Sequence, residues 1–181
     1  LISIKKKFKK TEIVIENLTL GSENKEALLK QIDESSSSTL NNINLESNYF
    51  KKKRSLLYND KKKNFYENVK INITTLDEYL VINKIKYVDF LKIDTEGYEY
   101  EVLKGLKKNI ENVKLIMFEH HYDDMLDKGY SFGDIKDLLN KNNFMQIFKA
   151  KMPFRKTFEY VYINKEKIWL NCTILLINIY F

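Results

Sequence analysis

Two nearly continuous apolar runs constrain this chain more than any other feature of its sequence. They are YVDFLKI at residues 87–93 and VKLIMFE at residues 113–119. Such runs are typical of strands that are covered on both faces, as in a parallel sheet. Between the runs, apolar residues recur at steps of four and predict an amphipathic helix: Tyr98, Val102, Leu106 and Ile110. Strand, helix and strand in this order predict a right-handed crossover and an α/β sheet.

The elements after the second run extend the same pattern. Ser131, with Asp134 three positions later, predicts the start of a helix that ends at Asn142. Two further strands, at residues 144–150 and 158–165, are predicted to form a hairpin. From the first run onward, the predicted order is therefore strand, helix, strand, helix, strand, strand.

The first half of the chain has a less regular pattern. One strand is predicted within residues 11–22 and another within residues 64–76. Thr75 precedes Glu78 by three positions, the spacing of a capping box, which predicts a short helix through Leu80. Two polar, turn-rich stretches are predicted to form a long surface excursion: residues 34–42 and 51–64.

Composition predicts a water-soluble globular protein. The chain has 181 residues, enough for one domain, with 44% hydrophobic and 31% charged residues. The net charge of +6 comes with scattered lysine clusters that lack interleaved aromatic residues, so we expect solvated surface and no nucleic-acid partner. The single cysteine, Cys172, excludes an internal disulfide and suits a reducing cytoplasm. No secretory signal is visible, and the apolar tail at residues 168–181 is too short to cross a bilayer.

Acidic residues follow both apolar runs. Asp94 ends the first run, Glu119 and His120 end the second, and Glu96 and Gly97 lie in the loop between them. Ligands bind beyond the carboxyl ends of parallel strands, so these side chains share one rim if the two strands are neighbours. Carboxylates at such a rim can orient a hydroxyl, accept its proton or hold a divalent cation. The alternative is structural, because an Asp before a helix is often a helix cap and Gly is ordinary in a strand-to-helix turn.

The two histidines of the chain are adjacent. On a strand, His120 and His121 would point to opposite faces, which argues against both ligating one metal. We therefore interpret His120 as a polar neighbour of the site and expect no metal centre. The sequence contains no P-loop, no G-x-S-x-G elbow, no H-E-x-x-H and no G-x-G-x-x-G loop.

The segment VDFLKIDTEGYEYEVLKGL, residues 88–106, closely resembles the signature of the FkbM-type methyltransferases. These are S-adenosylmethionine-dependent enzymes with a class I Rossmann-like fold. Their signature is an apolar strand, then I-D-x-E-G-x-E and then V-L-K-G, which stand here at residues 93–99 and 102–105. Flanking segments also resemble the family: ENLTLGS, SSSSTL, TTLDEYL and LIMFEHH. The resemblance covers roughly residues 12–165.

The front of the chain departs from the family pattern. Family members begin with a strand and a glycine-rich loop that holds the methionine part of the cofactor. A second strand follows, and its terminal acid holds the ribose; neither strand is found here. The family's strand order is 3-2-1-4-5-7-6, so losing strands 1 and 2 would separate strand 3 from strand 4. We therefore expect a fragment: a partial methyltransferase domain at residues 1–167 and an apolar tail at residues 168–181.

The resemblance also implies roles for individual residues. Three residues would border the adenine side of the S-adenosylmethionine pocket: Asn17, Leu20 and Gly21. Asp94 would lie near the transferred methyl group, as orienter or base, with Glu96 second in that role. Glu119 and His120 would line the acceptor side, and His120 is included among the catalytic candidates.

The predicted reaction is therefore methyl transfer from S-adenosylmethionine to a hydroxyl group of a carbohydrate or other small molecule. The protein would mainly align the two reactants and remove a proton. The alternative is a non-catalytic methyltransferase-like remnant or interaction module. The missing glycine-rich loop motivates this alternative, and exposed sheet edges would favour self-association.

Overall fold

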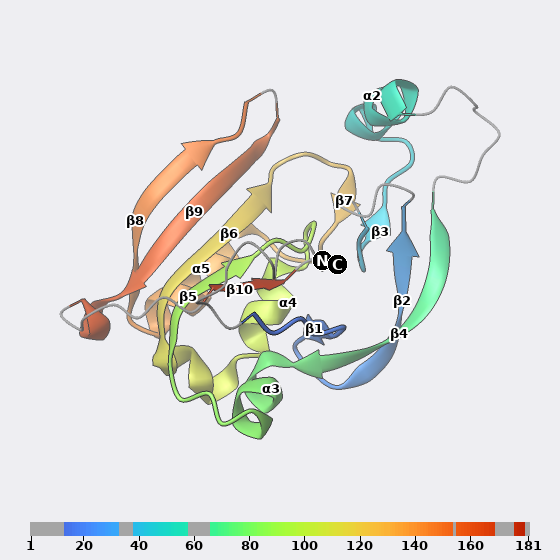
Figure 1. Ribbon diagram of the computed structural model, residues 1–181. Coiled ribbons are helices and arrows are strands. Elements are labelled where there is room, and N and C mark those ends of the chain that lie inside the picture. The colour runs from blue at the N-terminus through green and yellow to red at the C-terminus, as the bar shows by residue number, and fades with distance from the viewer. Residues whose placement is uncertain (1–12, 33–37, 58–65, 154, 169–175, 180–181) are drawn as a thin grey trace.

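The largest sheet among the described residues has five strands, which occupy one side of the molecule (Figure 1). The computed structural model describes residues 13–32, 38–57, 66–153, 155–168 and 176–179. The five strands are β5 (Val88–Ile93), β6 (Val113–His121), β8 (Phe144–Lys151), β9 (Thr157–Asn164) and β10 (Leu176–Ile179). Their order is β10-β5-β6-β9-β8. β10 and β6 are parallel to β5, whereas β9 is antiparallel to both β6 and β8.

The connection between β5 and β6 consists of two short helices. α4 spans Glu99–Lys104, and the 3₁₀ helix η2 spans Lys107–Asn112. The prediction of one continuous helix here is wrong, because Lys107 has a φ of +47°, which interrupts the helix after Gly105. The predicted apolar stripe is nevertheless buried, and Val102, Leu106 and Ile110 are at most 3% exposed.

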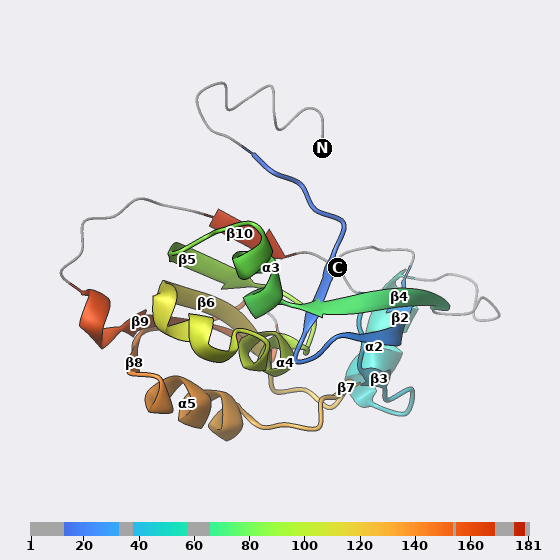
Figure 2. The same ribbon diagram turned by 90° about the horizontal axis from the view of Figure 1, so that it is seen from below.

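The core lies between the five-stranded sheet and two helices on the same side of it, α4 and α5 (Phe132–Lys141) (Figure 2). Ser131 and Asp134 form the predicted capping box at the start of α5. Aromatic residues of β6 and β9 fill the centre, where Tyr160 and Tyr162 stack on Phe118. The predicted hairpin of β8 and β9 is confirmed, with a register shift after Gln146.

A second sheet of three strands has the order β1-β4-β2. Its strands are β1 (Thr19–Gly21), β2 (Lys25–Gln31) and β4 (Glu67–Thr75). β4 was predicted, whereas the strand predicted within residues 11–22 is confined to Thr19–Gly21 and residues 13–18 form no strand. Thr75 caps α3 (Leu76–Ile82), and its hydroxyl accepts a hydrogen bond from the Glu78 amide at 3.2 Å.

The polar stretches after β2 are not simply a surface excursion, so that prediction is wrong in part. β3 (Asn42–Ile43) pairs with β7 (Leu126–Asp127), and α2 spans Asn48–Leu57. Thr39 is 0% exposed, because its side chain turns inward toward the segment that follows β5. Residues 34–37 and 58–64 of these stretches lie outside the described residues.

The apolar tail contributes β10 to the main sheet, beside β5. The proposed boundary at residue 167 stays a prediction, and Cys172 lies outside the described residues. Within the part of the chain that the structure describes, no helix is both long enough and apolar enough to cross a membrane.

Candidate functional site

The carboxyl ends of β5 and β6 bring two acids together, because the strands are parallel neighbours. Ile93 pairs with Phe118, so the next residues along the two strands are Asp94 and Glu119. Lys92 Nζ donates a hydrogen bond to Asp94 Oδ2 at 3.2 Å. Burial raises the pKa of Glu119, and the nearby negative charge of Asp94 raises it further. Asp94 does not cap α4, whose N-cap residue is Tyr98.

The backbone after β5 adopts a rare conformation at two successive residues. Glu96 has a φ of +43° and Gly97 a φ of +90°. Residues other than glycine rarely adopt a positive φ, and such backbone strain persists only where the surrounding structure stabilises it. A Cβ atom on Gly97 would lie 2.9 Å from both Asn41 Nδ2 and Leu126 Cδ1. The turn therefore requires glycine both for its φ and for the close approach of its neighbours.

Two polar side chains from the stretch after β2 hold this turn. Thr39 Oγ1 donates to the carbonyl oxygen of Glu96 at 2.8 Å. Asn41 Nδ2 donates to the carbonyl oxygen of Gly97 at 2.6 Å. Both donors are buried, at 0% and 8% exposure, so water does not compete for these carbonyl groups.

Glu99 holds the same turn from the other side. Its carboxylate is 0% exposed and accepts hydrogen bonds from Thr95 Oγ1 at 3.1 Å, the Gly97 amide at 2.8 Å and Tyr130 Oη at 2.6 Å. Burial and the charge of Glu99 raise the pKa of Tyr130, so its phenol stays a donor. The last acid of the DTEGYE segment therefore shapes the loop that carries Glu96.

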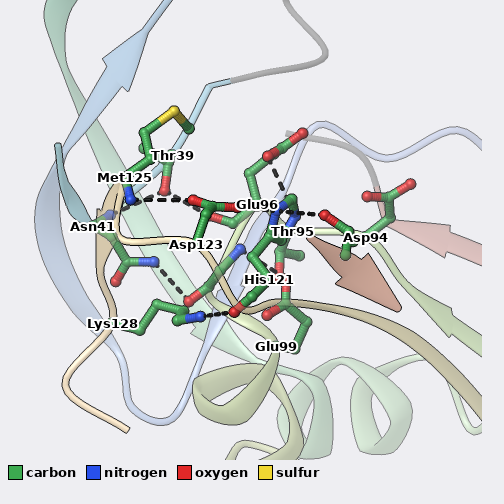
Figure 3. Close-up of polar contacts among 12 residues, drawn as sticks. Thr39, Asn41, Asp94, Thr95, Glu96, Glu99, His121, Asp123, Met125 and Lys128 are labelled. Atoms are coloured by element: carbon green, nitrogen blue, oxygen red, sulfur yellow. Dashed lines mark hydrogen bonds and ion pairs between the residues drawn. The ribbon is translucent and has the colours of Figure 1, made fainter. Parts of the chain in front are cut away.

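His121 lies at the end of β6 and faces Glu96 (Figure 3). Its Nε2 atom is 3.6 Å from Glu96 Oε2. On the other side of the ring, Nδ1 is 3.6 Å from Asp123 Oδ2 and 3.1 Å from Thr157 Oγ1. The His121 side chain is 7% exposed, so the ring is fixed between two carboxylates in a largely dry setting.

Opposing influences act on the charges around His121. Burial alone would lower the pKa of His121, but Asp123, Glu96 and Glu99 outweigh it, and the pKa is raised. Burial likewise opposes a charge on Asp123, yet His121 and the Met125 amide hold the pKa of Asp123 below its ordinary value. The pKa of Lys128 is lowered by burial, and its ammonium group donates to the carbonyl oxygen of His121.

His120 points to the opposite face of β6, as the alternation of a strand predicts. Its ring lies 4.7 Å from the centroid of Tyr122, 6.0 Å from that of Tyr130 and 5.5 Å from that of Phe132. Burial, with Lys128 and His121 nearby, lowers the pKa of His120 to about 4. Its Nδ1 atom is buried and has no hydrogen-bond partner among the residues that the structure describes. The structure thus places His121, rather than His120, in contact with Glu96.

The predicted adenine-side residues lie in and before β1. Asn17 is exposed, whereas Leu20 is 5% exposed and belongs to the main core. Gly21 lies against the ring of Tyr98, whose Cε1 atom would be 3.2 Å from an added Cβ. β1 therefore reaches the DTEGYE segment through Tyr98.

Sequence reasoning missed several residues that build this site: Thr39, Asn41, Glu99, Asp123 and Lys128. The role of Thr39 and Asn41 could not be predicted from the sequence, because their hydrogen-bond partners are backbone carbonyl groups 57 and 56 positions away. Asp123 stands two positions after His121, a spacing that could have indicated their contact. No group of three or more His, Cys, Asp or Glu residues suited to a metal ion is found among the residues that the structure describes.

Comparison with known proteins gives one match. The model of the FkbM methyltransferase domain matches residues 3–145, which is more than half of the chain and includes every site residue described above from β1 to Tyr130. No curated protein and no solved structure matches the chain. The chain belongs to the FkbM methyltransferase family.

Proposed function

We propose that the protein transfers a methyl group from S-adenosylmethionine to a hydroxyl group of a carbohydrate or another small molecule. The observation that carries this proposal is the acidic rim at the carboxyl ends of β5 and β6, where Asp94 and Glu119 lie side by side. Family membership supports methyl transfer in general. The choice of a hydroxyl acceptor is the finer part of the proposal, and it rests on the proton-accepting groups at this rim.

The order of the strands supports the fold that the family implies. The neighbours β5-β6-β9-β8 correspond to the 4-5-7-6 part of the class I methyltransferase order, including an antiparallel strand in third place. β1, which corresponds to the family's third strand, lies in a separate sheet with β4 and β2. In such folds, ligands bind beyond the carboxyl ends of the parallel strands, where the acidic rim lies.

The donor set at the rim fits a positively charged ligand. S-adenosylmethionine supplies a methyl group on a positively charged sulfur atom. Asp94 and Glu119 provide negative charge at one place, where burial and the charge of Asp94 raise the pKa of Glu119. A bound cation would stabilise the ionised form of Glu119. We propose Asp94 as the residue that orients the acceptor hydroxyl and takes its proton, with Glu96 as the second candidate.

The adenine side of the pocket is proposed along the segment from Asn17 to Gly21. Asn17 is exposed and free to turn its amide to a ligand, whereas Leu20 is buried, so only its backbone would face one. Glu119 is proposed on the acceptor side. His120 is neutral at physiological pH and lies among aromatic rings on the opposite face of β6, so its proposed contribution is to support the end of the strand that carries Glu119. We propose the cytoplasm as the compartment, since the single cysteine forms no internal disulfide.

Calorimetric titration with S-adenosylmethionine tests the cofactor. The protein is expressed from its complete reading frame, and a folded sample is expected to bind the compound and to bind S-adenosylhomocysteine. A well-folded sample that binds neither compound would refute the proposal and favour a non-catalytic methyltransferase-like module.

Replacement of Asp94 tests the catalytic assignment. Methyl transfer from radiolabelled S-adenosylmethionine is measured against a panel of sugars and small hydroxyl compounds. Asp94→Asn is expected to reduce turnover about 100-fold, the range of a single proton-transfer group, with little change in cofactor affinity. Asp89→Asn, on the same strand but at its amino end, is the matched control. Equal turnover in both variants would remove Asp94 from this role.

A further inference from the structure

The contact between His121 and Glu96 is built from three separate parts of the fold. Glu96 lies in the loop after β5, His121 ends β6, and Thr157 begins β9. Within this arrangement the two ring nitrogens of His121 have different partners. Nε2 faces Glu96 and Nδ1 faces Asp123 (Figure 3). Nδ1 also lies 3.1 Å from Thr157 Oγ1. A buried imidazole with a polar partner on each nitrogen is fixed in its orientation.

Glu96 is presented to His121 by a strained backbone. Its φ of +43° is maintained by the hydrogen bond from Thr39 to the Glu96 carbonyl and by the bonds that fix Gly97. Its side chain is 15% exposed, so the carboxylate is partly accessible while one oxygen faces the imidazole. Strain of this kind is concentrated at functional sites, where it fixes a side chain in one direction.

The charges around His121 come from every element packed against it. Three carboxylates act on the ring: Glu96 from the loop after β5, Glu99 from α4 and Asp123 from the segment after β6. Lys128 is the nearby cation, with its ammonium group on the His121 carbonyl oxygen, whereas the adjacent His120 has a pKa lowered to about 4 and is uncharged at neutral pH. The carboxylates outweigh the burial of the ring, and the pKa of His121 is raised.

We propose that His121 is a positioning residue that holds the Glu96 carboxylate toward the acceptor side of the rim. Asp123 and Thr157 orient the imidazole from behind, so the ring presents Nε2–H to Glu96. This inference rests on the proposed function, which places Glu96 beside the acceptor. His121 touches neither reactant and acts through Glu96 alone.

The first test needs no cofactor and no acceptor. The Cε1–H resonances of both histidines are followed by NMR as a function of pH in the wild type and in Glu96→Gln. We expect the substitution to lower the pKa of His121 by about one unit, the effect of an opposite charge within a few ångströms. His120 is the internal reference, and Asp124→Asn removes an exposed acid close in sequence as the matched control. An unchanged pKa of His121 in Glu96→Gln would overturn the proposal.

The second test separates positioning from packing. His121→Ala is expected to reduce turnover at least 10-fold while leaving the affinity for S-adenosylmethionine within about two-fold, because the ring does not touch the cofactor. His121→Gln, whose amide can still donate a hydrogen bond to Glu96, should recover part of the lost turnover. If both variants are equally impaired at every pH, His121 has a packing role only. If the wild type transfers no methyl group, the proposed function fails, and the NMR comparison still decides whether His121 and Glu96 are coupled.

Discussion

At the scale of residues, the DTEGYE segment distributes three acids among three environments. Asp94 is half-buried at the rim, Glu96 is aimed by a left-handed backbone, and Glu99 is fully buried among three donors. The sequence motif alone does not distinguish these acids. In the structure, Glu99 stabilises the loop, whereas Asp94 and Glu96 are the acids that remain partly accessible to a ligand. Gly97 makes the separation possible, because the turn between Glu96 and Glu99 depends on its φ of +90°.

Replacement of Gly97 tests how much of this loop depends on the turn. We expect Gly97→Ala to lower the free energy of unfolding by about 3 kcal/mol, as strain at the left-handed φ adds to the clash with Asn41 and Leu126. Gly129→Ala is the matched control, since Gly129 has a φ of +65° but nothing within 4 Å of an added Cβ. That variant should lose only about 1 kcal/mol. Urea denaturation measures both, and equal losses would show that crowding at Gly97 is negligible.

At the scale of elements, the sequence predicted those whose pattern is carried by their own residues. Local spacing was enough to predict the apolar strands β5 and β6 and the capping box of α5. β2 (Lys25–Gln31) could not be predicted from the sequence, because KEALLKQ is composed of good helix formers. It is a strand because it pairs with β4. The site divides in the same way. Its acids were predicted from the ends of the strands, whereas Thr39 and Asn41 depend on contacts that no local pattern encodes.

The strand β6 ends in two histidines that make stability depend on pH in opposite directions. The folded-state pKa of His120 is lowered from 6.5 to about 4, so its contribution is intact above pH 6.5 and is lost as the pH falls toward 4. The pKa of His121 is raised, so its contribution is present below the unfolded value and is lost as the pH rises through the folded value.

His120→Phe tests this assignment. Phenylalanine keeps a ring among Tyr122, Tyr130 and Phe132 but takes up no proton. Between pH 6.5 and 4, the wild type is expected to lose up to about 3 kcal/mol relative to this variant, the equivalent of the shift in pKa. The free energy of unfolding is measured by urea denaturation at several pH values. Parallel pH profiles for the two proteins would contradict the prediction.

At the scale of the whole molecule, the two sheets are joined at the end of α4. The carbonyl oxygen of Gly21 in β1 lies so close to Gly105 that an added Cβ would be 2.0 Å from it. The carbonyl oxygen of Gly105 accepts a hydrogen bond from the Asp77 amide in the first turn of α3 at 2.9 Å. Ser22 Oγ also donates to Glu101 Oε2 on α4 at 2.5 Å. Gly105 therefore lies where β1, α3 and the end of α4 meet. β1 includes part of the segment proposed for adenine, and α4 follows the loop beside the acidic rim (Figure 1).

Gly105→Ala should weaken the link between the sheets. The new methyl group cannot be accommodated without displacing the β1 backbone, so we expect a loss of about 3 kcal/mol in the free energy of unfolding. Gly133→Ala in α5 is the matched control, because its Cβ meets only Ser131 Oγ at 3.3 Å and alanine favours the helix. Hydrogen exchange locates the effect. Amides of β2 and β4 should lose protection before those of β5 and β6, since β4 pairs with the displaced β1 and with β2 in the three-stranded sheet. Uniform loss of protection across both sheets would show instead that they unfold as one cooperative unit.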